Sequence, residues 1–175
     1  SDQAFISYEM NREVLPKSHG FPARVLLPGK YGMKQPRWLS EIEVTDSWTR
    51  GYWENRGWSY DMNVKMTARI DAAIQKAKQP NSEWLVTGIA YCGAESVGQV
   101  EVSFDEGKSW QQAKLTSEIH PNAWVTWAID WQPTTTGEQI IAARVIDKTG
   151  ARQIEDDSGN FPSGATGLHR VIVYV

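Results

Sequence analysis

The sequence has a single cysteine, few histidines and no long apolar run. With Cys92 as the only cysteine among 175 residues, the chain can form no internal disulfide. Its apolar runs fall far short of the roughly 20 residues that span a membrane as a helix. A net charge of -3 argues against nucleic acid as the main partner, because such partners are bound by basic surfaces.

The few histidine and cysteine residues limit the metal sites that the chain could form. His19, His120 and His169 stand in separate contexts, and no two have the helix or hairpin spacing of zinc ligands. Cys92 is a soft ligand in principle, but it ends a predicted strand, where a small buried hydrophobic residue is expected. The sequence therefore predicts no metal site made of its own side chains. A Gly-x-Ser-x-Gly elbow is also absent, which argues against that class of hydrolase.

The first residues, Ser-Asp-Gln-Ala, show no signal peptide pattern, and no internal repeat or low-complexity tract follows. Hydrophobic residues make up 41% and charged residues 22%, which is ordinary for a globular protein. Nine tryptophans are an excess. They suit a β-rich core or a large interface.

From residue 83 onward, short strands are predicted at even spacing. Together with a strand at 65–71, the predicted strands cover residues 84–92, 99–104, 109–115, 123–131, 139–147 and 168–175. Gly107 is expected to adopt positive φ in a hairpin turn. This pattern is typical of a seven-stranded immunoglobulin-like sandwich, and the lack of a Cys-Trp-Cys pattern excludes an antibody-type domain.

The first part of the chain is less regular. Residues 4–11 predict a short helix or strand, and residues 38–44 alternate as a half-buried strand does. Residues 46–62 are rich in aromatic side chains and predict a loop that wraps a site. Residues 71–78 have helical propensity, and residues 61–82 are interpreted as a junction between two domains.

A basic stretch at residues 15–38 contains the side chains best suited to binding a ligand. It contains one histidine, five basic side chains, four prolines and three glycines, which predict a shaped cradle for an anion. The guanidinium groups of Arg24 and Arg37 are suited to holding a phosphate through paired hydrogen bonds. The alternative is a proline-rich surface loop with a short buried strand at 25–27.

Several sequence motifs resemble a known family. His-Gly-Phe-Pro-Ala-Arg at 19–24, Pro-Gly at 28–29 and the tripeptide before Trp38 resemble the end of the molybdopterin-binding domain of the sulfite oxidase family. Val-Glu-Val-Ser-Phe-Asp at 100–105, Ala-Trp-Val at 123–125 and Leu-His-Arg-Val at 168–171 resemble its dimerisation domain. The residues that the resemblance places against the cofactor are His19, Arg24, Gln35, Pro36 and Arg37.

The resemblance implies a mainly β chain. Residues 1–60 would be the C-terminal segment of an α+β molybdopterin-binding domain, and 83–175 with the strand at 65–71 an immunoglobulin-like (E-set) dimerisation domain. It implies two-electron oxo transfer at a molybdenum-molybdopterin cofactor, with the cysteine ligand of molybdenum outside this chain. The partners it implies are a second copy of the chain, the remainder of the cofactor domain and an external electron acceptor such as a cytochrome. Compartment is unknown from the sequence, and the resemblance leads us to expect a periplasmic or otherwise extracytoplasmic location.

The substrate pocket is where the sequence departs from the family. In sulfite-oxidising members, an arginine before the terminal His-Arg-Val and a tyrosine of the aromatic loop line the pocket. Ser163 and Trp58 match these positions here, which puts sulfite as the substrate in doubt. Arg56 is expected beside the pterin or the neighbouring domain, whereas a structural role is expected for His169 and Arg170.

Two functions of other classes remain open. The first is a non-catalytic β-sandwich module for dimerisation or interaction, because the thiolate ligand is absent. A carbohydrate-binding sandwich is the third hypothesis, and exposed coplanar aromatic rings would favour it.

Overall fold

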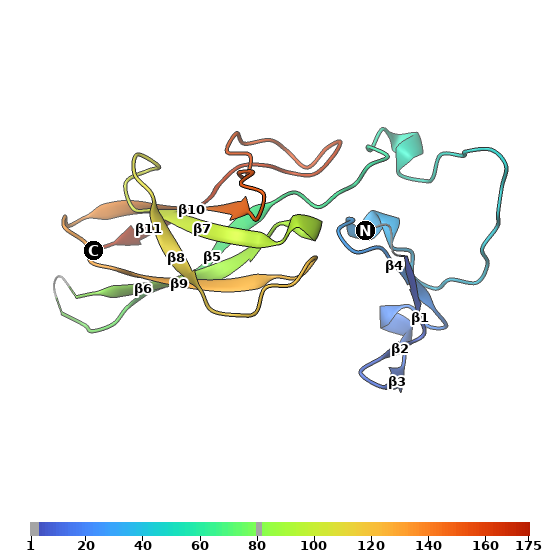
Figure 1. Ribbon diagram of the computed structural model, residues 1–175, viewed down its shortest axis with the longest axis horizontal. Helices are drawn as coiled ribbons and strands as arrows, with labels where there is room; N and C mark the ends of the chain where they lie inside the picture. The colour runs from blue at the N-terminus through green and yellow to red at the C-terminus, as the bar shows by residue number, and fades with distance from the viewer. Residues whose placement is uncertain (1–3, 80–81) are drawn as a thin grey trace. The chain divides into compact units, whose positions relative to one another are not determined.

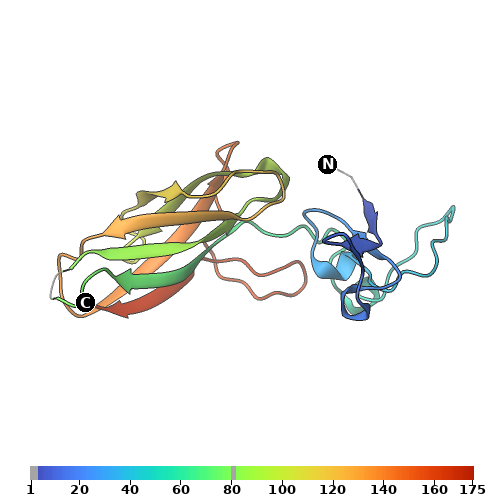
Figure 2. The same ribbon diagram turned by 90° about the horizontal axis from the view of Figure 1, so that it is seen from below.

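The computed structural model describes residues 4–79 and 82–175, and the chain divides into two compact units (Figures 1 and 2). The first unit extends to Val64 and includes Asn160–Gly164. The second comprises Lys65–Gly159 and Ala165–Val175. Among the described residues, helix occurs only as single 3-10 turns, and no helix is long and apolar enough to cross a membrane.

The second unit is a seven-stranded antiparallel β-sandwich. Its elements are β5 (Thr67–Gln75), β6 (Trp84–Tyr91), the turn η4 (Gly93–Glu95), β7 (Val97–Ser103), β8 (Gln111–Leu115), β9 (Val125–Trp131), β10 (Glu138–Asp147) and β11 (His169–Tyr174). The strands are ordered β11-β10-β7-β8-β9-β6-β5. β8 joins the two layers, because residues 111–113 pair with β7 whereas Lys114 and Leu115 pair with β9. The expected seven-stranded sandwich is confirmed.

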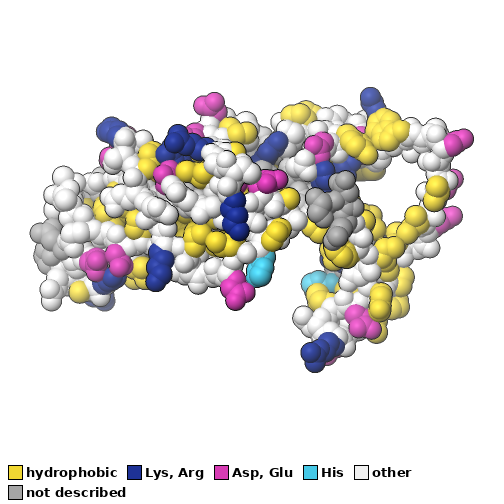
Figure 3. All heavy atoms as spheres, viewed as in Figure 1, with side chains coloured by type: hydrophobic (Ala, Val, Ile, Leu, Met, Phe, Trp, Pro, Cys, Tyr) yellow, Lys and Arg dark blue, Asp and Glu magenta, His cyan; other side chains and the backbone are white. Residues whose placement is uncertain are grey.

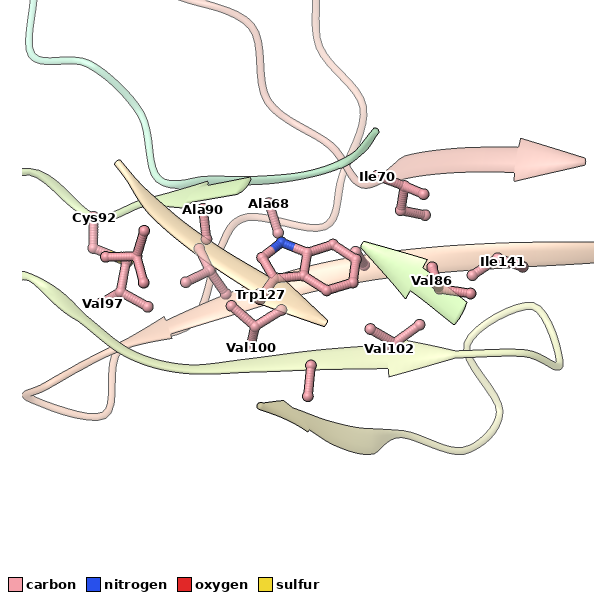
Figure 4. Close-up of a cluster of buried hydrophobic side chains, with 14 of the residues drawn as sticks. Ala68, Ile70, Val86, Ala90, Cys92, Val97, Val100, Val102, Trp127 and Ile141 are labelled. Carbon is pink, nitrogen blue, oxygen red and sulfur yellow. The ribbon is translucent and has the colours of Figure 1, made fainter. Parts of the chain in front are cut away.

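Alternating side chains fill the space between the layers. Val125, Trp127, Ile129 and Trp131 alternate along β9 and share one face, since all four pack in the core. Trp127 is 1% exposed, and Figure 4 shows its ring among small side chains of both layers. Gly88 is its cross-strand partner, and a Cβ there would lie 2.5 Å from the Trp127 ring. The large ring therefore requires a glycine opposite it.

The first and last strands of the sandwich are linked by a side chain. A bulge interrupts the pairing of β5 with β6 between Ile70 and Ala72. The Ile70 N–H donates to Nδ1 of His169, at the start of β11, over 3.1 Å. The structural role predicted for His169 is thus to satisfy a backbone donor next to the bulge.

A charged network lies on the outer side of the β7–β10 layer. Arg144 is 8% exposed. Its Nε donates to Glu101 over 2.7 Å, and its Nη1 donates to Glu155 over 2.6 Å. The guanidinium also lies 4.0 Å from the centre of the Trp110 ring. These contacts satisfy a cation that would be costly to bury alone.

The first unit consists of short strands and turns. Its elements are β1 (Phe5–Ser7), β2 (Glu9–Met10), β3 (Glu13–Val14), η1 (Lys17–His19), β4 (Arg24–Leu26), η2 (Gly32–Lys34) and η3 (Glu54–Arg56). β1 pairs with β4, and β2 pairs with β3. Of the two forms expected for residues 4–11, the structure has strand.

Two predicted elements are wrong. No described strand pairs with residues 38–44, where Ile42 is 63% and Val44 94% exposed. Alternation separates two faces of a segment, but a strand also needs a neighbour to bond with. The helical propensity of residues 71–78 is overridden as well, because β5 continues to Gln75 in register with β6.

Candidate functional site

The two halves of the basic stretch lie side by side in the first unit. Backbone hydrogen bonds join Val25 N–H to the Pro36 carbonyl (3.0 Å) and Leu39 N–H to the Ala23 carbonyl (2.8 Å). A third joins Trp38 N–H to the carbonyl of Gly20 (3.2 Å). These bonds hold residues 20–25 next to residues 36–39, so the side chains of both segments have defined positions.

Arg24 and Arg37 flank Gly20. A Cβ built on Gly20 would lie 3.1 Å from Cβ of Arg24 and 3.2 Å from Cβ of Arg37. The φ of Gly20 is 120°, a value that side chains disfavour. Nη1 of Arg37 donates to the Ser18 carbonyl over 2.9 Å, and Nη1 of Arg24 donates to the His19 carbonyl over 3.2 Å. Both guanidinium groups are therefore held against the same turn, η1.

The charges of these two arginines are not neutralised within the described chain. Neither guanidinium forms an ion pair with a described carboxylate. Nε of Arg24 is buried and has no hydrogen-bond partner among the described residues. Arg37 lies 4.6 Å from the centre of the Trp38 ring, and that indole donates to the Lys17 carbonyl over 2.8 Å. The turn thus presents positive charge and unused donors to an anion.

Two lysines of the stretch are already paired. Lys30 binds Asp61 at 2.6 Å, and Lys34 forms an ion pair with Glu54. The hydrogen bond from Lys34 lowers the pKa of the Glu54 carboxyl. Lys34 also lies 4.4 Å from the centre of the Tyr60 ring. These lysines hold the loop of residues 46–62 and are less available to a ligand than the two arginines.

Aromatic rings enclose a cavity of about 250 Å³ within this loop. It is lined by Trp48, Arg50, Glu54, Gly57, Trp58 and Tyr60. The ring of Trp58 meets the rings of Trp53 and Phe161 edge to face, at 6.2 Å and 5.3 Å between centres. Phe161 belongs to the segment Asn160–Gly164, which packs within the first unit. The cavity therefore combines aromatic walls with the guanidinium of Arg50 and the carboxylate of Glu54.

Comparison with known proteins identifies the family. Residues 1–53 match the family model described as the oxidoreductase molybdopterin binding domain, and residues 56–174 match the Mo-co oxidoreductase dimerisation domain. The mitochondrial sulfite oxidase of Rattus norvegicus is 32% identical over 169 residues. The chain belongs to the sulfite oxidase family of molybdenum oxidoreductases. The match covers 83% of this chain but only 31% of the rat enzyme, so the chain spans about a third of that relative's length.

Other relatives of this sulfite oxidase family member differ in their named activity. An NADH nitrate reductase of Volvox carteri is 28% identical over 170 residues, covering 74% of this chain and 19% of the alga's enzyme. The crystal structure of the sulfane dehydrogenase SoxCD from Paracoccus pantotrophus superposes with a TM-score of 0.72 at 23% identity. That comparison covers 99% of this chain and 49% of the other, and it shows a shared fold.

The structure places the five residues that the sulfite oxidase resemblance puts against the cofactor as follows. Arg24, Arg37 and His19 meet at η1, where the exposed His19 belongs to the turn itself. Gln35 is used differently, because its Nε2 donates to the Lys30 carbonyl over 2.7 Å. Pro36 contributes its carbonyl to Val25. The side chains brought together are thus those of the first motif and Arg37.

Of the three pocket candidates, Trp58 is the one among the residues that line the cavity. Trp58 lines the cavity, whereas Arg56 lies 3.4 Å from the centre of the Tyr52 ring and donates to the Tyr52 carbonyl. Ser163 is partly buried in Asn160–Gly164, the segment whose Pro162 carbonyl accepts from the Ser59 N–H over 2.9 Å. Arg56 therefore serves the loop rather than the cavity.

Sequence reasoning missed two features of the site. Arg50 is the cavity's guanidinium, and nothing distinguishes it in sequence from Arg56, the other arginine of the aromatic loop. Gly20 lies between the side chains of Arg24 and Arg37. Its position directly after His19 in the first motif is the sequence feature that could have indicated this role. Cys92 lies in the core of the sandwich at 6% exposed, as expected for a small hydrophobic residue.

Proposed function

We propose that this chain forms part of a molybdenum-cofactor oxidoreductase in which Arg24 and Arg37 bind the phosphate of molybdopterin. Their shared position around Gly20, with no described carboxylate paired to either, carries the proposal. A phosphate accepts several charge-assisted hydrogen bonds from guanidinium groups, which suits two arginines at one turn. His19 supplies a further donor from the same turn.

The residues present fit such a group. The partnerless buried Nε of Arg24 is a donor that a phosphate oxygen would satisfy. Replacing Gly20 by any other residue would place a Cβ within 3.3 Å of both arginine side chains. Gln35 and Pro36 stay predicted contacts of the cofactor, with the Gln35 side chain and N–H and the Pro36 carbonyl already bonded within the loop.

When bound, the molybdenum group supplies two-electron redox chemistry with exchange of an oxo group. This chain's share is to hold the phosphate and fix the orientation of the pterin. We expect the cysteine ligand of molybdenum outside this chain, because Cys92 is buried in the sandwich core. There burial, with the negative charge of Asp147 as a second cause, raises the pKa of the Cys92 thiol to about 12.

We propose that the aromatic cavity is the substrate pocket and that sulfite is not its substrate. Trp58 lines it in place of a tyrosine, and the phenol that the lining carries is that of Tyr60. Ser163 carries no charge to hold an oxyanion. The lining holds one guanidinium, that of Arg50, and one carboxylate, that of Glu54, so it offers little net positive charge to an oxyanion.

We also propose a role for each domain and name the partners that the family implies. Residues 1–60 would complete the cofactor domain, 61–82 join the domains, and 83–175 with 65–71 pair two subunits. The ranges of the two family models, 1–53 and 56–174, support this division. An external electron acceptor such as a cytochrome and an extracytoplasmic location remain predictions from the family.

The cradle is tested by replacing each arginine in the complete enzyme, purified from a host that makes the cofactor. Arg24→Ala and Arg37→Ala should each lower the bound molybdenum and pterin about tenfold or more, because each loses charge-assisted hydrogen bonds to phosphate. Arg152→Ala, an exposed arginine of the second unit, is the matched control and should retain both.

Unchanged cofactor content in both cradle variants would contradict the proposal. A wild-type enzyme free of molybdenum in the same host would favour the non-catalytic module. A carbohydrate-binding role finds little support, because the stacked rings of Phe104 and Trp131 lie in the core with Trp131 only 8% exposed.

A further inference from the structure

A second cavity lies at one end of the sandwich, between the β7–β8 hairpin and the loop that joins β9 to β10. Its volume is about 350 Å³, which falls within the range of small-molecule sites. The lining comes from residues 104–111, residues 130–135 and Gln139, all of which belong to the second unit. We call this space the hairpin cavity. It shares no lining residue with the aromatic cavity of the first unit.

Hydrogen bonds fix both walls of the hairpin cavity. On one side, the Asp105 carboxylate holds the hairpin by accepting from the Ser109 hydroxyl over 2.6 Å and from the Ser109 N–H over 2.9 Å. On the other side, the Gln139 amide donates to the Thr135 hydroxyl over 3.1 Å and so ties the loop to β10. Because both walls are already ordered, a ligand would bind without a large loss of loop entropy.

The lining of the hairpin cavity is negatively charged. Asp105 and Asp130 are its ionisable groups, and its described residues include neither lysine nor arginine. Lys76 pairs with Asp130 at 2.7 Å from outside the lining, but the same ammonium also pairs with Glu83 at 2.8 Å. One cation is thus shared by two carboxylates. Figure 3 shows basic and acidic side chains interspersed on the sandwich, whereas the charge of this lining has one sign and favours a cation.

Hydrogen-bond acceptors and apolar atoms complement that charge. Oδ2 of Asp105 accepts the Ser109 hydroxyl, and a carboxylate oxygen has a second lone pair for a ligand N–H. The buried side of the cavity contains the rings of Phe104 and Trp131, which stack with 4.6 Å between centres. Trp131 is only 8% exposed, so the rings offer a small apolar patch. Such a patch suits a short alkyl chain better than the broad face of a sugar ring.

We propose that the hairpin cavity binds a small aliphatic amine, of which a diamine is the best match. Its ammonium groups would donate charge-assisted hydrogen bonds to Asp105 and Asp130, and its methylene groups would lie against Phe104 and Trp131. A diamine carries one positive charge for each carboxylate of the lining. The site requires no cofactor, so the proposal stands or falls independently of the cradle.

Isothermal titration calorimetry of the full chain at low salt tests the proposal, with the diamine putrescine as the probe. We expect a dissociation constant of about 1 mM or below, and no binding of glucose or succinate, the neutral and anionic probes. Asp130→Asn removes one charge of the lining and should weaken putrescine binding about tenfold. Asp71→Asn is the matched control and should bind as wild type does. Asp71 is also an exposed, ion-paired aspartate of the sandwich, but it lies outside the lining.

A second variant changes the volume of the cavity and leaves its charge unaltered. Thr134 is an exposed loop residue of the lining, so Thr134→Trp should fill the cavity, abolish putrescine binding and leave thermal unfolding unchanged. No heat of binding up to about 10 mM putrescine would overturn the proposal. The same conclusion would follow from unchanged binding in either cavity variant, from an equal loss in Asp71→Asn, or from glucose binding as tightly as putrescine.

Discussion

Arg144 shows at the scale of one residue how the sandwich tolerates a nearly buried charge. It is held by Glu101, Glu155 and the ring of Trp110. The side chain of Glu101 is 17% exposed and that of Glu155 is 45% exposed, so only the first partner depends strongly on the cation. Removing Arg144 would leave Glu101 as a carboxylate with little water and no counter-charge.

We therefore expect Arg144→Ala to lower the free energy of unfolding by about 2 to 3 kcal/mol, below the range for a fully buried pair because Glu155 is solvated. Urea unfolding measures this change. The matched control is Arg170→Ala, whose pair with Asp157 spans 3.5 Å between well-exposed side chains. That variant should change stability by about 0.5 kcal/mol or less.

A double variant tests the cause. Arg144→Leu with Glu101→Leu leaves only the solvated Glu155 without its partner, and should be more stable than Arg144→Ala alone. Additive losses in the double variant would show that packing, and not the orphaned carboxylate, dominates.

At the scale of an element, the hairpin between β7 and β8 is organised by Asp105. Its carboxylate accepts from the Ser109 hydroxyl (2.6 Å), the Ser109 N–H (2.9 Å) and the Ser103 hydroxyl (2.7 Å). These bonds, led by the Ser109 hydroxyl, lower the pKa of Asp105 to about 2. Gly107 follows with φ of 91°, which confirms the predicted turn.

This shift predicts a pH dependence. Because the pKa of Asp105 is lower in the folded chain than the usual value near 4, the carboxylate stabilises the fold fully above about pH 4. The contribution is lost as the pH falls from about 4 to about 2. The difference in denaturation midpoint between wild type and Asp105→Asn should therefore be constant at pH 5 to 7 and shrink below about pH 4. A difference that stays constant down to pH 3 would exclude the hydrogen-bonded carboxylate as its source.

The strands were the most predictable part of the chain. Trp127 of β9 and Val173 of β11 lie in the core at alternate positions of their strands, and this period of two is what made both strands predictable from the sequence. The same rule failed at Ile42, where the pattern is present but no described neighbour pairs with the segment. Ala72 and its neighbours have helical propensity but form a strand. Pairing with β6 outweighs a helical propensity of a few tenths of a kcal/mol per residue.

The site was predictable where a motif fixed it. Arg24 and Arg37 lie 13 positions apart in the sequence, and only the backbone bonds of their two segments bring them to one turn. The motif carried that information, whereas composition alone favoured a surface loop.

At the scale of the whole sandwich, Cys92 reports on its integrity. The thiol is 6% exposed and packs with residues of both layers, so a reagent reaches it only when the layers separate. Its raised pKa also leaves little thiolate at pH 8. Labelling of native protein by a disulfide reagent should be at least about 100-fold slower than labelling in denaturant.

A Cys92→Ala, Thr136→Cys variant serves as the exposed control and should react equally fast in both conditions. Rapid labelling of native wild type would mean that the core opens locally at the end of β6.

The bond between Ile70 and His169 joins residues that are 99 positions apart. During translation, β5 leaves the ribosome long before its partner imidazole exists. Until β11 emerges, Val171 and Val173 are missing from the core and the edge of β10 has no neighbour. The sandwich can therefore close its core only after β11 has been synthesised, and the nascent chain exposes an unpaired strand edge until then.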